Sequence, residues 1–201
     1  MPRSRFDELM AMAEEHDGLV TAEQARQSGF TDSVLTRLTQ RGRLERITRG
    51  VYRIPHFPLS RFSQYIEAVL WAKANRGPDD VAVSHLTALN VYGISDANPE
   101  RIHITVPRST RLRRQQPKGI VVHRAVLARD DIRLHEGVPV TTIDRTIQDL
   151  LHAEVRVDLI RQAITDARRE GFIGEAESRR LRRKVDTRIQ EKHAHLKEEN
   201  E

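Results

Sequence analysis

Short polar and arginine side chains recur at intervals of three and four near the start of the chain. The five positions are Ser33, Thr36, Arg37, Gln40 and Arg41. This spacing places them on one face of a helix that begins at Thr31 or Asp32 and ends near residue 41. Arginine forms paired hydrogen bonds with guanine in the major groove, and glutamine does so with adenine. The pattern predicts a helix face, with Thr31 at its start, that contacts the base edges of double-stranded DNA.

Four more arginines surround a predicted hairpin directly after this helix. They are Arg43, Arg46, Arg49 and Arg53. Strand-forming residues flank the dipeptide at 49–50, which predicts a tight turn. A guanidinium group binds phosphate through two hydrogen bonds, so we expect these side chains along the DNA backbone or in the minor groove. The alternative is an amphipathic helix pair with a solvated polar face, and frequent arginine also accompanies a GC-rich genome.

The elements around these side chains follow the order of a winged helix-turn-helix. Helices are predicted at 4–16, 22–28 and 32–41, and the hairpin at 44–54. Thr21 and Gln24 fit a capping box at the start of the second helix. Pro55 and Pro58 interrupt the pattern, so we expect a DNA-binding domain over residues 1–56.

After the winged helix the chain alternates between helical and strand patterns. Helices are predicted at 60–75, 84–92, 144–151, 158–170 and 175–196, and strands at 102–106, 120–127 and 138–141. We expect an α/β domain over 57–152 and a helical C-terminal extension over 153–201 that packs on this domain or continues it. The last helix has a narrow apolar seam of Leu181, Val185 and Ile189, typical of docking or of a solvated helix. The predicted fold class is therefore α+β, with a winged helix, a mixed α/β domain and a helical C-terminal region.

A second group of cations lies in residues 101–129, which contain eight Lys and Arg residues and no Asp or Glu. The candidates for a second contact with nucleic acid or with a partner are Arg108, Arg111, Arg113, Arg114, Lys118 and Arg124. No Phe, Tyr or Trp is interleaved with them, which argues against stacking on single-stranded bases. A solvated hairpin loop, or a docking surface for an acidic protein, explains the same charge.

Composition excludes several classes of protein. The chain has 201 residues, a net charge of +5 and no cysteine, so disulfides and cysteine-ligated zinc are excluded. No apolar run reaches the ~18 residues of a membrane-spanning helix, and the N-terminal sequence has no apolar signal core. We expect a cytoplasmic protein that does not associate with membranes.

Patterns that would indicate catalysis are weak. The C-terminal half has no Asp followed by the spaced Glu-x-Lys of a metal-dependent nuclease, and His123-Arg124 lacks the aspartate of a kinase catalytic loop. His85, His103 and His123 have no metal-ligand spacing, so each is expected to have a structural role. We expect no catalytic residues, no metal, no cofactor and no enzyme activity.

Six segments of the chain, taken in order, resemble the AbiEi family of antitoxins from type IV toxin–antitoxin (abortive infection) systems. They are residues 18–25 (GLVTAEQA), 44–54 (LERITRGVYRI), 82–93 (AVSHLTALNVYG), 102–107 (IHITVP), 121–125 (VVHRA) and 137–150 (GVPVTTIDRTIQDL). The resemblance extends over residues 5–152. The charged segment after residue 171 matches no motif of the family.

The resemblance implies a winged helix that binds operator DNA and represses the operon of its own system. It also implies a C-terminal domain that counteracts a nucleotidyltransferase-like toxin, through a functional or a physical interaction. Two alternatives stay open: a stand-alone repressor without a toxin, and an antitoxin that binds the toxin directly while its DNA binding is incidental. Pairing of two winged helices on inverted repeats is a further expectation.

Overall fold

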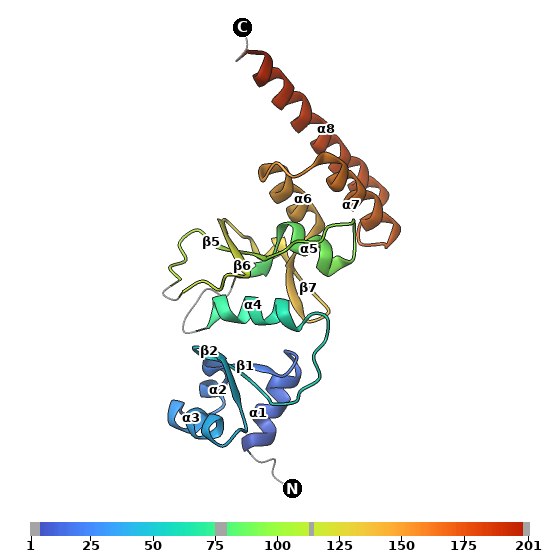
Figure 1. Cartoon of the computed structure of the whole chain (residues 1–201). Helices are drawn as coiled ribbons and strands as arrows, with labels where there is room; N and C mark the ends of the chain where they lie inside the picture. Colours follow the sequence, from blue (N-terminus) through green and yellow to red (C-terminus); the bar gives the residue numbers. More distant parts are fainter. Residues whose placement is uncertain (1–4, 75–79, 113–114, 199–201) are drawn as a thin grey trace.

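A computed structural model describes residues 5–74, 80–112 and 115–198, and Figure 1 shows their arrangement. We call residues 5–54 the head and residues 63–198 the body. The head is a winged helix, and the body combines a mixed sheet with helices. The predicted α+β class is confirmed, including the order of winged helix, sheet region and C-terminal helices.

The head consists of three helices and a three-stranded antiparallel sheet. Its elements are α1 (Arg5–Glu14), β1 (Leu19–Thr21), α2 (Ala22–Gln27), α3 (Asp32–Gln40), β2 (Glu45–Thr48) and β3 (Val51–Arg53), with the strand order β1-β3-β2. The turn between β2 and β3 lies at Arg49-Gly50, where Gly50 has a φ of 84°. Glycine adopts this left-handed conformation without a steric penalty, which explains the tight turn.

Local sequence signals position the helices of the head. The Thr21 hydroxyl accepts a hydrogen bond from Gln24 N at 3.1 Å, and Gln24 Oε1 accepts one from Thr21 N at 2.8 Å. The predicted capping box is therefore present. Leu9, Leu35 and Leu44 are fully buried and bring α1, α3 and the start of the hairpin together.

The body is built on a five-stranded sheet. Its strands are β4 (Ala82–Val83), β5 (Ile102–Pro107), β6 (Ile120–Ala125), β7 (Ile132–His135) and β8 (Val138–Thr141), in the order β6-β5-β4-β8-β7. β5 and β6 pair in parallel. The expectation of a hairpin loop between them is therefore wrong, because residues 108–119 must return along the sheet to start a parallel strand.

Helices cover both faces of this sheet. They are α4 (Ser63–Lys73), α5 (His85–Tyr92), α6 (Ile143–His152), α7 (Val157–Arg169) and α8 (Glu175–Glu198), with a short 3-10 helix at Arg129–Asp131. α4 lies between the sheet and the head, and α5 and α6 lie on the opposite face (Figure 1). No helix in the described part of the chain is both long and apolar enough to cross a membrane.

The apolar seam of α8 packs on the body itself. Leu181 and Val185 are fully buried in the same hydrophobic cluster as α6 and α7. Lys184 forms an ion pair with Asp144 of α6 at 3.0 Å. This part of α8 is therefore docked on the body and is not a solvated helix, while its C-terminal turns extend away from the body (Figure 1).

The head and the body share part of their packing. Leu19 and Val51 of the head are fully buried and belong to the same hydrophobic cluster as α4. Arg53 of β3 forms an ion pair with Glu67 of α4 at 2.7 Å. The head is therefore seated on α4 through apolar contacts and a charged contact.

The connection between head and body is also closely packed. Ser63 Oγ donates a hydrogen bond to Asp17 Oδ2 at 2.8 Å. Gly18 has a φ of 77°, and a Cβ built there would lie 2.4 Å from Phe57 Cγ. Glycine is required at this position because the backbone conformation is left-handed and the ring leaves no room for a methyl group. The domain boundary at residue 56 stays a prediction.

Candidate functional site

The outer face of α3 carries the side chains with the spacing of a recognition helix. Arg37, Gln40 and Arg41 are exposed, whereas Leu35 on the opposite side is fully buried. No carboxylate among the described residues pairs with Arg37 or Arg41. These three side chains are thus free to donate and accept hydrogen bonds with a ligand. We call the set of Thr31, Ser33, Thr36, Arg37, Gln40 and Arg41 the α3 surface.

Three hydroxyl-bearing side chains occupy the start of α3. Thr31 is the N-cap, and its Oγ1 accepts a hydrogen bond from Val34 N at 3.4 Å. Ser33 Oγ lies 2.8 Å from Thr31 Oγ1, and Thr36 Oγ1 donates to the backbone oxygen of Asp32 at 2.9 Å. All three side chains are exposed. Each of these hydroxyl groups therefore already has a hydrogen-bond partner within α3 or its N-cap.

The hairpin places its arginines in three different environments. Arg46 and Arg49 are exposed on β2 and at the turn. The Arg43 guanidinium lies 5.3 Å from the centre of the Phe6 ring, in a cation–π contact. Arg53 is only 19% exposed and is paired with Glu67. The structure therefore directs Arg53 toward Glu67 of the body, and a DNA contact by Arg53 stays a prediction.

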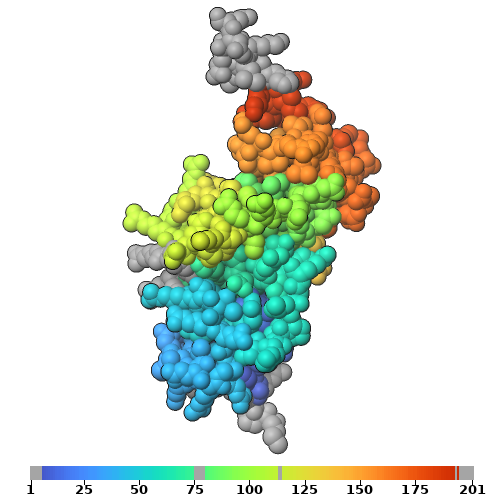
Figure 2. Space-filling model, in the orientation of Figure 1, coloured from blue at the N-terminus to red at the C-terminus, as the bar shows by residue number. Residues whose placement is uncertain are grey.

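The second basic group lies in the body, mainly in the long connection between β5 and β6. Arg108, Arg111, Lys118 and Arg124 are exposed, while Arg113 and Arg114 lie outside the described residues. In Figure 2 the yellow-green part of the chain protrudes on the same side of the molecule as the blue α3 and hairpin. A ligand that follows this side of the molecule can meet both groups of cations.

The fold also brings together three histidines that are far apart in sequence. His85 is the first residue of α5, His103 lies on β5 and His123 lies on β6. His103 Nδ1 and His123 Nε2 are 3.0 Å apart, and the rings of His85 and His123 stack with their centres 3.6 Å apart. One nitrogen atom of each ring lies within 4.8 Å of the others. We call these residues the histidine cluster.

Burial keeps the imidazoles of the cluster neutral. Desolvation lowers the pKa of His85 to about 3, and the neighbouring His123, His103 and Arg145 contribute to the same shift. Burial, followed by the effect of His103, lowers the pKa of His123 to about 4. The pKa of His103 is lowered by burial and by Arg101. At neutral pH each ring therefore has one N–H group and one nitrogen atom with a lone pair.

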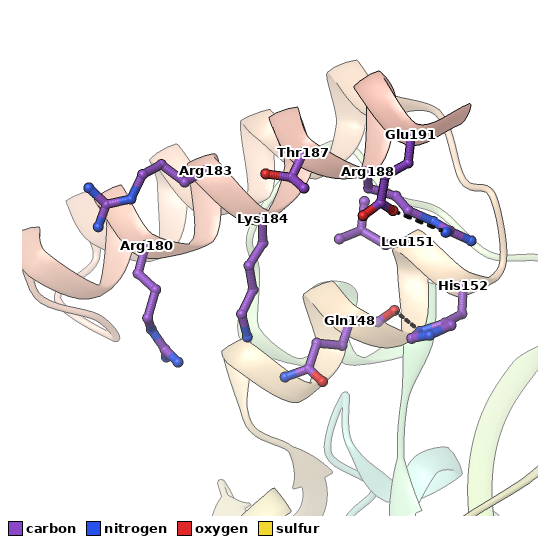
Figure 3. A pocket seen from close by; sticks show the side chains of 9 residues that line it. All are labelled: Gln148, Leu151, His152, Arg180, Arg183, Lys184, Thr187, Arg188 and Glu191. Atoms are coloured by element: carbon purple, nitrogen blue, oxygen red, sulfur yellow. Dashed lines mark hydrogen bonds and ion pairs between the residues drawn. The ribbon is translucent and has the colours of Figure 1, made fainter. Parts of the chain in front are cut away.

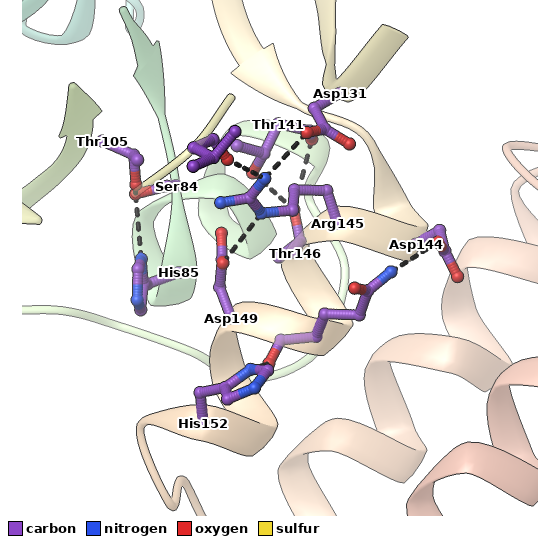
Figure 4. Close-up of polar contacts among 12 residues, drawn as sticks. Ser84, His85, Thr105, Asp131, Thr141, Asp144, Arg145, Thr146, Asp149 and His152 are labelled. Atoms are coloured by element: carbon purple, nitrogen blue, oxygen red, sulfur yellow. Dashed lines mark hydrogen bonds and ion pairs between the residues drawn. The ribbon is translucent and has the colours of Figure 1, made fainter. Parts of the chain in front are cut away.

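His85 and His123 line a cleft of about 450 Å³ that Arg108, Arg124 and Arg145 also border. Figure 4 shows the polar contacts at one side of this cleft. Arg145 donates hydrogen bonds to Asp149 Oδ1 at 2.9 Å and to Asp131 Oδ2 at 2.7 Å. The cleft thus combines neutral imidazoles with arginine side chains.

Asp149, on α6, has one carboxylate oxygen without a described partner. The residue is 9% exposed, and Oδ2 is buried with no hydrogen-bond partner among the described residues. Burial raises the pKa of its carboxyl group, and the contacts with Arg145 oppose that shift. Among the described residues, Oδ2 is therefore a buried polar atom without a hydrogen-bond partner next to the cleft.

A second basic cleft, of about 500 Å³, lies between α6 and α8 (Figure 3). Lys184 and Arg180 of this lining both pair with Asp144, and Arg188 pairs with Glu191 at 3.5 Å. Most of its positive charge is thus neutralised by carboxylates within the molecule. This cleft is therefore a weaker candidate for a polyanion than the α3 surface.

Sequence reasoning identified the α3 surface but missed the histidine cluster. The α3 side chains lie within nine residues of one helix, so their spacing is sufficient to predict a shared face. The three histidines come from a helix start and two strands, and only the parallel register of β5 and β6 brings His103 and His123 onto the same face. The spacing of the histidines in the sequence carries no signal for this cluster, because their proximity is tertiary.

Comparison with known proteins gives two matches along the chain. A family profile described as a transcriptional regulator and AbiEi antitoxin matches residues 7–55, and one described as the AbiEi antitoxin C-terminal domain matches residues 81–188. The second match shows that the charged segment after residue 171 belongs to the matched domain as far as residue 188.

Two further searches complete the comparison. No curated protein matches the chain. A crystal structure of the RV2827C protein from Mycobacterium tuberculosis is similar over 90% of this chain and 72% of that chain, with 17% sequence identity and a TM-score of 0.49.

Proposed function

The chain belongs to the AbiEi antitoxin family, and we propose that it binds operator DNA through the head and represses transcription of its own operon. The body, in this proposal, counteracts a nucleotidyltransferase-like toxin. Such a protein acts where its operator is, in the cytoplasm. The observation that carries the DNA-binding part is the α3 surface, whose arginines are exposed and have no carboxylate partner among the described residues.

The chemistry of the α3 surface suits the major groove of DNA. Arg37 and Arg41 supply paired N–H donors for guanine, and Gln40 supplies the donor and acceptor that adenine requires. Arg46 and Arg49 lie on the hairpin beside this helix, where they can contact phosphates without reading sequence. The head thus contains separate groups for sequence readout and for backbone contact.

The β5–β6 connection extends the proposed contact to the body. Arg108, Arg111 and Lys118 are exposed and lie in a segment without acidic residues. Each phosphate contact releases condensed counterions, so the number of such contacts sets the salt dependence of binding. If this segment contacts DNA, the binding constant of the full chain will fall more steeply with salt concentration than the phosphate contacts of the head alone predict. We call this dependence the salt slope.

We test DNA binding with fluorescence anisotropy on a duplex of the region upstream of the gene. Arg37→Ala and Gln40→Ala should relax sequence preference, at about 1–3 kcal/mol per lost base contact. Arg46→Ala should weaken binding to all sequences and reduce the salt slope by about one. Arg179→Ala on α8 is the matched control, because it removes an exposed arginine far from the head. An unchanged affinity in a variant combining Arg37→Ala, Gln40→Ala and Arg49→Ala would overturn the proposal.

The antitoxin part needs a separate test. The full chain is co-expressed with a nucleotidyltransferase-like toxin encoded beside it, and growth is compared with toxin alone. Rescue of growth supports the proposal, and the absence of such a neighbouring gene favours a stand-alone repressor. Co-purification of the two proteins would identify direct binding as the route of neutralisation. The number of chains bound per DNA duplex that contains an inverted repeat shows whether two heads bind together.

A further inference from the structure

We propose that His85, His103 and His123 form a binding site for a divalent metal ion of the class that prefers imidazole ligands, with Zn²⁺ as the first choice. The three rings offer nitrogen atoms that all lie within 4.8 Å of one another. Three histidines with an open position are an established donor set for zinc in proteins. This inference does not rest on the proposed DNA binding, because it is argued from the positions of the three rings alone.

The contact between His103 and His123 is close to what a shared metal ion requires. Their nitrogen atoms are 3.0 Å apart, so the two neutral rings share one proton. Two ligands at about 2.0–2.1 Å from a tetrahedral zinc ion are ~3.3 Å apart, by the geometry of that coordination. A metal ion can therefore lie between the two nitrogen atoms if the donating ring moves its proton to its other nitrogen and the two rings separate by a few tenths of an ångström.

His85 is held by neighbours that leave its other nitrogen for the ion. His85 Nδ1 lies 2.9 Å from Ser84 Oγ, and Thr105 Oγ1 donates to the same oxygen at 2.7 Å. A ligating histidine usually makes such a contact with its second nitrogen, which sets the tautomer of the ring. In the structure His85 is stacked on His123, so binding requires the ring to turn toward the cleft that it lines.

The surroundings favour an ion with one position open to the cleft. Arg108, Arg124 and Arg145 also border the cleft and oppose a bare cation. The carboxylate of Asp149, which also borders the cleft, offsets part of this positive charge. The same arginines favour an anion as the exchangeable ligand.

The test is a titration with CoCl₂ and ZnCl₂. The sample is the full chain without an affinity tag, and a chelator has first removed any bound metal. His193 and His195 are changed to alanine in every sample, so that these two histidines near the C-terminus cannot contribute. The expected result is one ion per chain by calorimetry. Co²⁺ should give the intense visible absorption of a tetrahedral site, and Zn²⁺ should abolish that absorption.

The variants decide whether the cluster is the site. His103→Ala and His123→Gln should each weaken Zn²⁺ binding by more than the ~10–100-fold typical of losing an outer-shell contact. His152→Ala is the matched control, because His152 lines the same cleft but is not part of the cluster. Fluorescence of Trp71, buried in the body, verifies that each variant is folded. The proposal is overturned if the starting protein binds no ion, or if folded His103 and His123 variants bind as tightly as the His152 control.

Discussion

Arginine side chains have different surroundings in the head and in the body. On α3, Arg37 and Arg41 are exposed and form no ion pair with the described residues. In the body, Arg145 is only 13% exposed and contacts Asp131, Asp149 and the backbone oxygen of Val126. The head therefore keeps its positive charge available to a polyanion, whereas α6 uses it to hold the body together.

This difference shows why the number of cations in a segment does not identify a binding surface. Residues 1–54 contain nine arginines and eight acidic residues, yet Arg37 and Arg41 form no ion pair with a described residue. The cleft between α6 and α8 is rich in cations, but Asp144 alone pairs with two of them. What matters for binding is the pairing and burial of each side chain, and both can be altered by mutation.

The largest expected effect is the loss of Arg145. Arg145→Met leaves Asp149 buried without its partner, and breaking a buried ion pair from one side costs about 3–5 kcal/mol of unfolding free energy. Urea unfolding followed by the fluorescence of Trp71 measures this loss in the body. The control, Arg37→Met in the head, should change stability by less than ~0.5 kcal/mol. Equal effects of the two substitutions would contradict the contrast between structural and available arginines.

A smaller effect is expected at the junction between the two regions. Gly18→Ala adds a methyl group in contact with Phe57 and strains a left-handed backbone, so we expect a loss of about 2–4 kcal/mol. Gly29→Ala is the matched control, because Gly29 has a similar φ of 81° and open space around it. That variant should lose only ~1–2 kcal/mol. Thermal unfolding compares the stabilities of the two variants. Similar losses of stability would show that Phe57 moves aside without a loss of free energy.

The smallest effect concerns Arg53, which belongs to the head by sequence but is paired with the body. A double-mutant cycle with Arg53→Met and Glu67→Gln should give a coupling energy of about 0.2–1 kcal/mol, as for partly exposed ion pairs. Arg53→Met should also leave the salt slope of DNA binding unchanged, unlike Arg46→Ala. A reduced slope would return Arg53 to the DNA contacts and weaken the contrast between the regions.

Most of the head could be predicted because its signals are local, but β1 (Leu19–Thr21) was missed because three residues are too few for a strand pattern. The capping pair at Thr21 and Gln24 predicted the start of α2, and the helix predicted at 32–41 is observed at Asp32–Gln40. The hairpin turn at 49–50 was also predicted, because glycine tolerates the backbone conformation that this turn needs.

The body was harder to predict because its organisation is not local. β4 has only two residues, too few for an alternating pattern, and β7 is an edge strand whose Leu134 is exposed. The parallel pairing of β5 and β6 depends on the whole sheet, so the loop between them was misread as a hairpin. The histidine cluster depends on that register and could not have been found from residue spacing.

The packing of Leu19 and Val51 with α4 has a consequence for communication within the molecule. Since these head residues share a buried cluster with the body, the head cannot tilt without disturbing that packing. In the proposed function, a partner that shifts α4 on binding must therefore change the affinity of the head for operator DNA. By thermodynamic linkage the operator must then change the affinity for that partner by the same factor. In that proposal, the apolar packing of the head on α4 couples DNA binding by α3 to the binding of a partner by the body, and the coupling acts in both directions.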